Sequence, residues 1–166
     1  MNIFSRIASW FRSSEPPAAP AAAQRVWPKH DVYATSFADP EDVRRFQACK
    51  RQGKTDQECF KGGDNGIGTP RLGRINSAGS SIGVDTTAPT PMCALPPEDW
   101  RPLGAAAAGA KVSVTVGDRT VICELRDTMP SKKNVKNGAG IDLNPAAAKA
   151  LGLKPPFKVR ATWQFV

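Results

Sequence analysis

Long apolar runs are missing from this 166-residue sequence, and no stretch approaches the ~20 consecutive apolar residues that a membrane-spanning helix needs. Metal-binding patterns are missing too. The only histidine, His30, lies far along the chain from the four cysteines, and no two cysteines have CxxC spacing, so a zinc site is not predicted. No run of Lys and Arg is interleaved with aromatic residues, so nucleic acid is not a predicted partner.

Loops that hold phosphate or calcium are also lacking. The segment 63–68 reads GDNGIG, which is neither the GxGxxG of a dinucleotide site nor a P-loop with its lysine. Its acidic and amide groups do not follow the EF-hand pattern either. Turn geometry explains this segment, and no cofactor is expected.

Proline and glycine are plentiful, with 15 and 14 residues, and their spread leaves room for one compact domain with tails. The 23 Lys and Arg residues exceed the 15 Asp and Glu residues, which gives a formal net charge of +8. Such a charge favours polyanionic surroundings: nucleic acid, anionic lipid or an acidic cell-wall polymer. A basic surface that is simply solvated is the alternative.

The N-terminal residues 1–13 carry apolar side chains at helical spacing, which predicts a short amphipathic helix. Serine and arginine interrupt the apolar positions, so a cleaved signal peptide is not predicted, and the location is left open between cell envelope and phage. The helix Met1–Arg12 has two candidate partners, a membrane surface or, as we favour, the groove of a protein. Residues 14–25 predict a Pro/Ala-rich linker, and the folded domain spans 26–166.

The middle of the chain predicts a strand over 32–37 followed by an insertion at about 39–91. Asp39 is a candidate N-cap for a first helix, and the capping-box spacing of 55–58 predicts a second. Cys49 and Cys59 are candidates for a disulfide across this helical hairpin if the protein is exported. Residues 62–91 are rich in Gly, Ser, Thr and Pro, which predicts a long surface loop.

The C-terminal half predicts a β-hairpin of strands 112–116 and 120–126, with Asp127 where the second strand ends. Asn144 has the position of an N-cap, and a short helix should run from there to about residue 151. Residues 159–166 alternate between apolar and polar and should form the closing strand.

Two motifs in this half carry a resemblance to a known family. Residues 121–130 read VICELRDTMP and residues 137–152 read NGAGIDLNPAAAKALG. They resemble the double-psi β-barrel domains of the rare-lipoprotein-A and expansin type, in which a strand ends in a D-x-G-P turn and IDLS opens an Ala-rich helix. The likeness reaches back more loosely to 33–37 and 93–96. It implies a mainly β fold, a six-stranded barrel, with a groove that holds a glycan strand in several relatives, among them lytic transglycosylases, endoglucanases and expansins.

The chemistry that this resemblance implies needs a carboxylic acid to protonate the leaving oxygen of a glycosidic bond. Asp127 and Asp142 are the candidate catalytic residues, because each adjoins the end of a predicted β-element beside a Gly- or Pro-containing loop. A lytic transglycosylase can use one residue as acid and then as base, provided that burial raises its pKa. In the alternative, Asp142 accepts hydrogen bonds from loop amides and Asp127 caps a turn.

Candidate residues for binding the substrate lie near these acids. Trp100, beside turn residues, is the better candidate for stacking on a sugar ring, whereas Trp163 in the closing strand is expected in the core. Tyr33, Thr128 and Asn137 are the other candidates for glycan contact.

The sequence departs from the family pattern in two places. Met129 stands where the family has the glycine before Pro130, and no histidine matches the one that often accompanies the acid, since His30 precedes the first predicted strand.

Two functions follow. In the first, the barrel is directed at peptidoglycan and binds or cleaves its glycan strands, as a lytic transglycosylase or glycoside hydrolase. In the second, it is a non-catalytic structural or adaptor protein of a bacterial or phage assembly, docked through its N-terminal helix. The two aspartates and the long loop favour the first; the missing signal peptide and Met129 favour the second.

Overall fold

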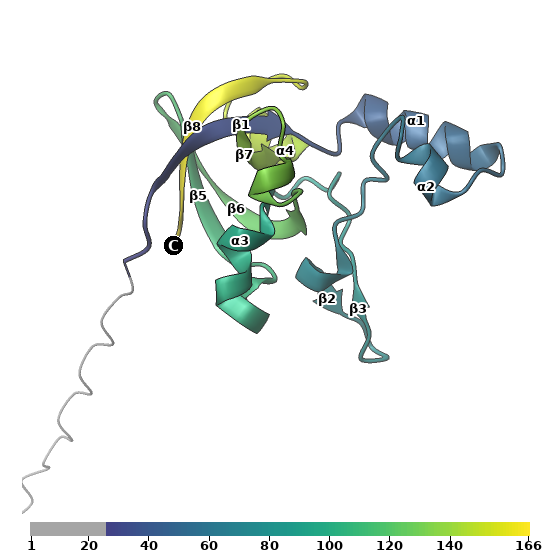
Figure 1. Cartoon of the computed structure of the whole chain (residues 1–166), viewed down its shortest axis with the longest axis horizontal. Coiled ribbons are helices and arrows are strands. Elements are labelled where there is room, and N and C mark those ends of the chain that lie inside the picture. Colours follow the sequence, from purple (N-terminus) through teal and green to yellow (C-terminus); the bar gives the residue numbers. More distant parts are fainter. Residues whose placement is uncertain (1–25) are drawn as a thin grey trace, which may run out of the picture.

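Six segments with strand-like sequence close into a barrel in the computed structural model, which describes residues 26–166 (Figure 1). Neighbouring strands follow the order β1-β7-β4-β6-β5-β8 around the barrel. The pairs β1/β7 and β4/β6 are parallel, and the other neighbouring pairs are antiparallel. The strands are β1 (His30–Ser36), β4 (Met92–Leu95), β5 (Lys111–Val116), β6 (Arg119–Thr128), β7 (Ala139–Leu143) and β8 (Lys158–Phe165).

This mixed six-stranded barrel confirms the predicted mainly β class and is consistent with a double-psi barrel. The first strand begins earlier than predicted, so His30 lies inside β1 and its ring stacks on Trp163 with 4.1 Å between centroids. The predicted N-terminal helix 1–13 and linker 14–25 lie outside the described residues.

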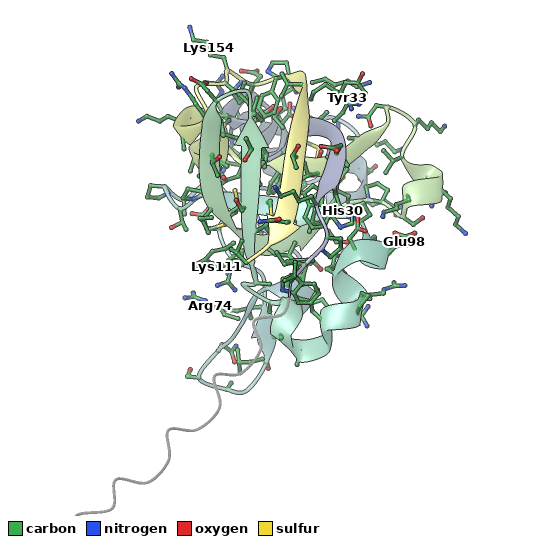
Figure 2. The ribbon with its side chains drawn as sticks, turned by 90° about the vertical axis from the view of Figure 1, so that its left-hand side faces the viewer. His30, Tyr33, Arg74, Glu98, Lys111 and Lys154 are labelled. Atoms are coloured by element: carbon green, nitrogen blue, oxygen red, sulfur yellow. A yellow bond between two sulfur atoms is a disulfide. The ribbon has the colours of Figure 1, made fainter. Side chains whose placement is uncertain are left out.

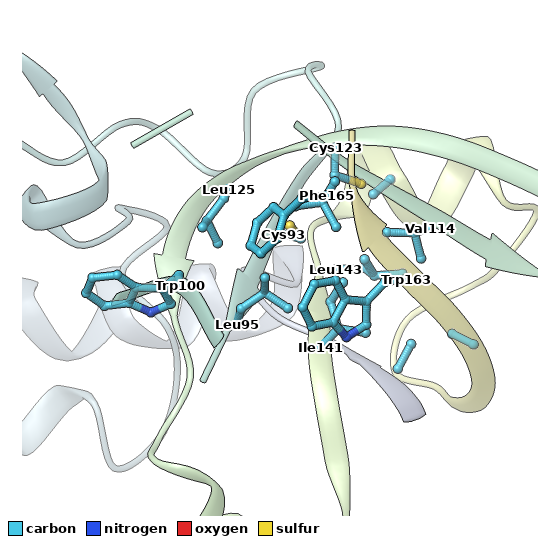
Figure 3. Close-up of a cluster of buried hydrophobic side chains, with 14 of the residues drawn as sticks. Cys93, Leu95, Trp100, Val114, Cys123, Leu125, Ile141, Leu143, Trp163 and Phe165 are labelled. Carbon is cyan, nitrogen blue, oxygen red and sulfur yellow. The ribbon is translucent and has the colours of Figure 1, made fainter. Parts of the chain in front are cut away.

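The barrel interior is filled by the apolar side chains that alternate along the strands (Figure 3). Trp163 is 1% exposed, which confirms it as a core residue, and Cys123 is fully buried in the same core. The close-up shows Cys93 and Cys123 in the same cluster, with Leu125 beside them on β6. Apolar burial of this kind is the main favourable contribution to folding of a small barrel.

The insertion between β1 and β4 lies to one side of the barrel (Figure 1). It contains α1 (Pro40–Arg51) and α2 (Asp56–Cys59), and a disulfide joins Cys49 to Cys59. The predicted capping box is present, since the Thr55 hydroxyl accepts a hydrogen bond from the Glu58 amide and the Glu58 carboxylate accepts one from the Thr55 amide.

The rest of the insertion is more ordered than the predicted surface loop. It contains η1 (Pro70–Leu72) and a small sheet of β2 (Arg74–Ile75) and β3 (Ser81–Ile82), and the side chains of Leu72 and Thr86 are fully buried. Strands of two residues are too short to give a periodic pattern, which is why the sequence did not predict them.

The remaining helices are α3 (Pro97–Trp100), η2 (Arg101–Ala107), η3 (Lys132–Asn134) and α4 (Pro145–Ala150). None of the helices within residues 26–166 is long and apolar enough to cross a membrane.

Asn144 joins three parts of the chain through its fully buried side chain. Its Oδ1 atom accepts hydrogen bonds from the Ala147 amide, as the predicted N-cap of α4, and from the Met92 amide at the start of β4. Its Nδ2 atom donates to the carbonyl oxygens of Thr86 and Thr90. Four hydrogen bonds at one buried amide therefore hold the end of β7, the start of β4 and the insertion together.

We expect Asn144→Ala to lower the free energy of unfolding by about 3 kcal/mol, because it removes a helix cap and leaves buried backbone groups unsatisfied. Urea denaturation measures this loss. The matched control is the exposed Asn134→Ala, for which a change within about 0.5 kcal/mol is expected. A variant at 144 that unfolds at the same urea concentration as the parent would contradict the assigned role.

Candidate functional site

A β-bulge sets the direction of the Asp127 side chain. In the parallel pair β4/β6, Cys93 lies opposite Leu125 but Ala94 lies opposite Asp127, so Arg126 is an extra residue in β6. An extra residue shifts the alternation of the strand by one position. Asp127 therefore shares the outer face with Ala94, while Cys93 and Leu125 point into the barrel core.

Asp142 lies on the same outer face as Asp127, on the other side of β4. Ala94 is also the register partner of Asp142 in the antiparallel pair β4/β7. Residues paired in register point to the same face of a sheet, and two strand spacings separate the two acids by about 10 Å between Cα atoms. Ala94 is the register partner of both, so the two candidate acids, 15 residues apart in the chain, are brought together on one outer face.

Asp142 lies on the wall of an open cavity of about 390 Å³. The Thr35 hydroxyl donates a hydrogen bond to its Oδ1 atom, and Thr35 is its register partner on β1. The opposite wall is formed by the segment 129–137, which leads from β6 to β7. The cavity is lined by Thr35, Ser36, Met129, Pro130, Asn134, Val135, Lys136, Asn137 and Asp142.

Asp127 is covered by the insertion and is not among the residues that line this cavity. Its Oδ1 atom accepts hydrogen bonds from the amides of Thr69, at 2.9 Å, and Thr128, at 2.8 Å. The neighbouring Gly68 allows this approach, because a Cβ atom there would lie 2.4 Å from the carbonyl oxygen of Arg126. The two acids therefore meet on one face, but only Asp142 faces the open cavity.

Burial raises the pKa of both carboxyl groups to about 6. For Asp142, the hydrogen bond from Thr35 opposes the rise, and the negative charge of Asp127 adds to it. For Asp127, the two amide hydrogen bonds oppose the rise. A carboxyl group with this pKa holds and releases its proton near neutral pH, as acid–base catalysis requires.

Two further acids at this site were not predicted. Asp39 is 9% exposed, and burial raises its pKa; its Oδ2 atom accepts a hydrogen bond from Ser36 instead of capping α1. The charge of Asp64 raises the pKa of Asp39, Asp127 and Asp142. From the sequence, Asp39 is expected only at a helix start and Asp64 only in a turn, and no motif connects either of them with residues far along the chain. Within residues 26–166, no group of three or more His, Cys, Asp or Glu is arranged to hold a metal ion.

The predicted substrate-binding residues separate into two groups. Asn137 lines the cavity, and Tyr33 is 37% exposed on the outer face of β1. Trp100, in contrast, is 5% exposed, and its Nε1 atom donates to the Thr128 hydroxyl at 3.1 Å. The prediction that Trp100 lies in the groove is wrong, because its indole packs in the core and its polar atom is used internally. The hydroxyl group of Thr128, another predicted glycan contact, accepts this hydrogen bond from the Trp100 indole.

The protein is therefore a six-stranded mixed barrel with a cluster of mostly half-buried acids on its outer face, of which Asp142 lines a cavity. No protein-family model matches the chain, and no curated protein matches its sequence. Among solved structures, the chain is similar to the Streptomyces papain inhibitor, with 20% identity, a TM-score of 0.48, and coverage of 84% of this chain and 94% of that one. This likeness is too distant to transfer an activity.

The raised pKa values predict how stability depends on pH. The folded protein takes up protons at Asp127 and Asp142 near pH 6, whereas the unfolded chain does so near the ordinary value of 3.8. Burying the charged carboxylates is therefore a cost above pH 6 that disappears as the pH falls toward 4. Asp142→Asn should raise the free energy of unfolding by about 1–2 kcal/mol at pH 7.5 and leave it nearly unchanged at pH 4.5.

Urea denaturation at the two pH values measures this difference. The matched control is Asp118→Asn in the exposed β5–β6 turn, which should not change the dependence on pH beyond the small effect of a surface charge. A loss of stability in Asp142→Asn at pH 7.5 would show that the carboxylate is stabilising where it lies, contrary to the argument from burial.

Proposed function

We propose that this barrel acts on the glycan strands of peptidoglycan, with Asp142 as the residue that transfers protons. One observation carries the proposal: a carboxyl group with a pKa of about 6 lies on the wall of an open cavity, with a second carboxyl group across Ala94. The resemblance of residues 121–130 and 137–152 to rare-lipoprotein-A domains supports this choice of substrate.

In the proposed reaction, protonated Asp142 donates its proton to the glycosidic oxygen as the bond from that oxygen to the anomeric carbon breaks. The Asp142 carboxylate then takes the proton from the 6-hydroxyl group of the same muramoyl residue, whose oxygen bonds to the anomeric carbon. Atoms and charge balance, and the product is an anhydro sugar. Attack by water in place of this hydroxyl would give hydrolysis.

Asp127 acts in this proposal through Asp142. It does not line the cavity, but its negative charge, where it is ionised, raises the pKa of Asp142. Thr35 orients the Asp142 carboxyl group through its hydroxyl. Both are positioning residues, because neither needs to touch the reacting atoms.

A non-catalytic structural or adaptor role in a bacterial or phage assembly is the second candidate. The hydrogen bond from the Thr69 amide to Asp127 supports it, because this contact ties the insertion to the barrel and gives one acid a purely structural use. The proposed docking helix Met1–Arg12 belongs to this candidate, with a protein groove or a membrane surface as its partner.

Digestion of purified sacculi and of peptide-free glycan strands tests the proposal. The parent should release fragments with anhydro ends, and Asp142→Asn should slow the release by about 10²–10⁴-fold, the range for loss of a general acid. The rate should fall as the pH rises above about 6, since Asp142 must begin protonated.

The control Asp118→Asn should cleave as the parent does. Equal release by the parent and Asp142→Asn would end the proposed mechanism, as would no release by the parent from any wall substrate. Co-sedimentation of both proteins with sacculi, without release, would leave glycan binding as the function. No sedimentation and no release would favour the adaptor.

A further inference from the structure

A row of register partners continues beyond the two acids across the barrel. Thr35 on β1 is paired with Asp142 on one side and with Lys158 of β8 on the other. The row therefore runs from Lys158 through Thr35, Asp142 and Ala94 to Asp127, and its members share the outer face. A positive side chain and the acid of the cavity thus lie on the same face, with one strand between them.

Two cations converge beside this row on a single aromatic ring. Tyr33 is the outward-facing residue before Thr35, and its register partner on β8 is Arg160. The Lys158 Nζ atom lies 4.6 Å from the centroid of the Tyr33 ring, and the Arg160 Cζ atom lies 5.2 Å from it. The ring face attracts both cations and so holds them close to one another.

These two cations lack a counterion within residues 26–166. No carboxylate there lies within ion-pair distance of Lys158 or Arg160. Asp31, which lines a cavity together with Arg160, accepts a hydrogen bond from the Thr162 hydroxyl. By contrast, Lys111 of β5 forms an ion pair with Glu124 of β6. Two like charges held together without a counterion make an anion the complementary ligand.

We propose that Tyr33, Lys158 and Arg160 form an anion subsite on the outer face of the barrel, beside the cavity at Asp142 and outside its lining, which binds a carboxylate carried by a sugar near the bond at Asp142. The inference rests on the proposed function and narrows its substrate class to acidic glycans. Lys158 and Asp142 flank the same residue, so their Cα atoms lie about 10 Å apart, a span comparable to a disaccharide. Glycan strands of peptidoglycan that carry no stem peptide meet this requirement, because the lactyl carboxyl groups of their muramoyl residues are free.

The experiment compares two soluble ligands, chitin oligosaccharides and the same oligosaccharides bearing carboxymethyl groups. Binding is measured by calorimetry at low ionic strength with the full chain carrying Asp142→Asn, so that neither ligand is cleaved. We expect the carboxymethylated ligand to bind about fivefold more tightly, and the added pair Lys158→Gln and Arg160→Gln to remove that preference.

The control pair is Lys61→Gln and Arg74→Gln, which changes the net charge equally at exposed residues of the insertion. Figure 2 shows Tyr33 at the upper end of the view and Arg74 at the lower end, away from the proposed subsite. This control should keep the preference for the acidic ligand. Thermal melting of each variant confirms that the barrel is folded.

If the Asp142→Asn protein with Lys158 and Arg160 intact binds both oligosaccharides equally, the proposed subsite is refuted and the proposed function still stands. A preference that survives Lys158→Gln and Arg160→Gln would also overturn it. If neither oligosaccharide binds, the proposed function and the subsite are both refuted. A DNA duplex that binds as tightly as the acidic glycan, and loses affinity equally in the subsite variant, would show an unselective polyanion surface and so refute the assignment.

Discussion

Ala94 is the residue on which the geometry of the site depends, because it is paired with Asp127 on one side and with Asp142 on the other. Its small side chain places little bulk between the strand positions of the two acids, which lie on either side of it on the same face. The bulge at Arg126 is equally necessary, since without it Ala94 would lie opposite Arg126, and the acid would move out of this position. A cluster of acids on the outside of the barrel is therefore a consequence of strand order and register.

The electrostatics of this face contrast with those of the whole chain. The protein carries a net charge of +8, yet Asp39, Asp64, Asp127 and Asp142 gather in one region, where burial raises the pKa of three of them. Basic side chains surround the acids: Lys136 lines the cavity, and Lys158 lies across β1 from Asp142. Positive and ionisable acidic side chains therefore lie close together on this face.

Local patterns in the sequence predicted the elements that depend on neighbouring residues. The capping box at Thr55, the N-cap at Asn144 and the alternation around Trp163 were each predicted correctly, because such signals act within a few positions. The motif resemblance supplied the barrel and the two candidate acids. The convergence of Asp39 and Asp64 on the site and the burial of Trp100 were not predictable, since they depend on how distant segments cross and not on any local spacing.

The most direct measurement of the central claim is the titration of the aspartate carboxyl carbons by NMR spectroscopy. We expect Asp127 and Asp142 to titrate near pH 6, and we expect Asp127→Asn to lower the pKa of Asp142, because the charge that raises it has been removed. The conservative Asp118→Asn change should leave both titrations in place. Titration of both groups near the ordinary value of 3.8, or a pKa of Asp142 that does not respond to Asp127→Asn, would contradict the existence of a buried, interacting pair across Ala94.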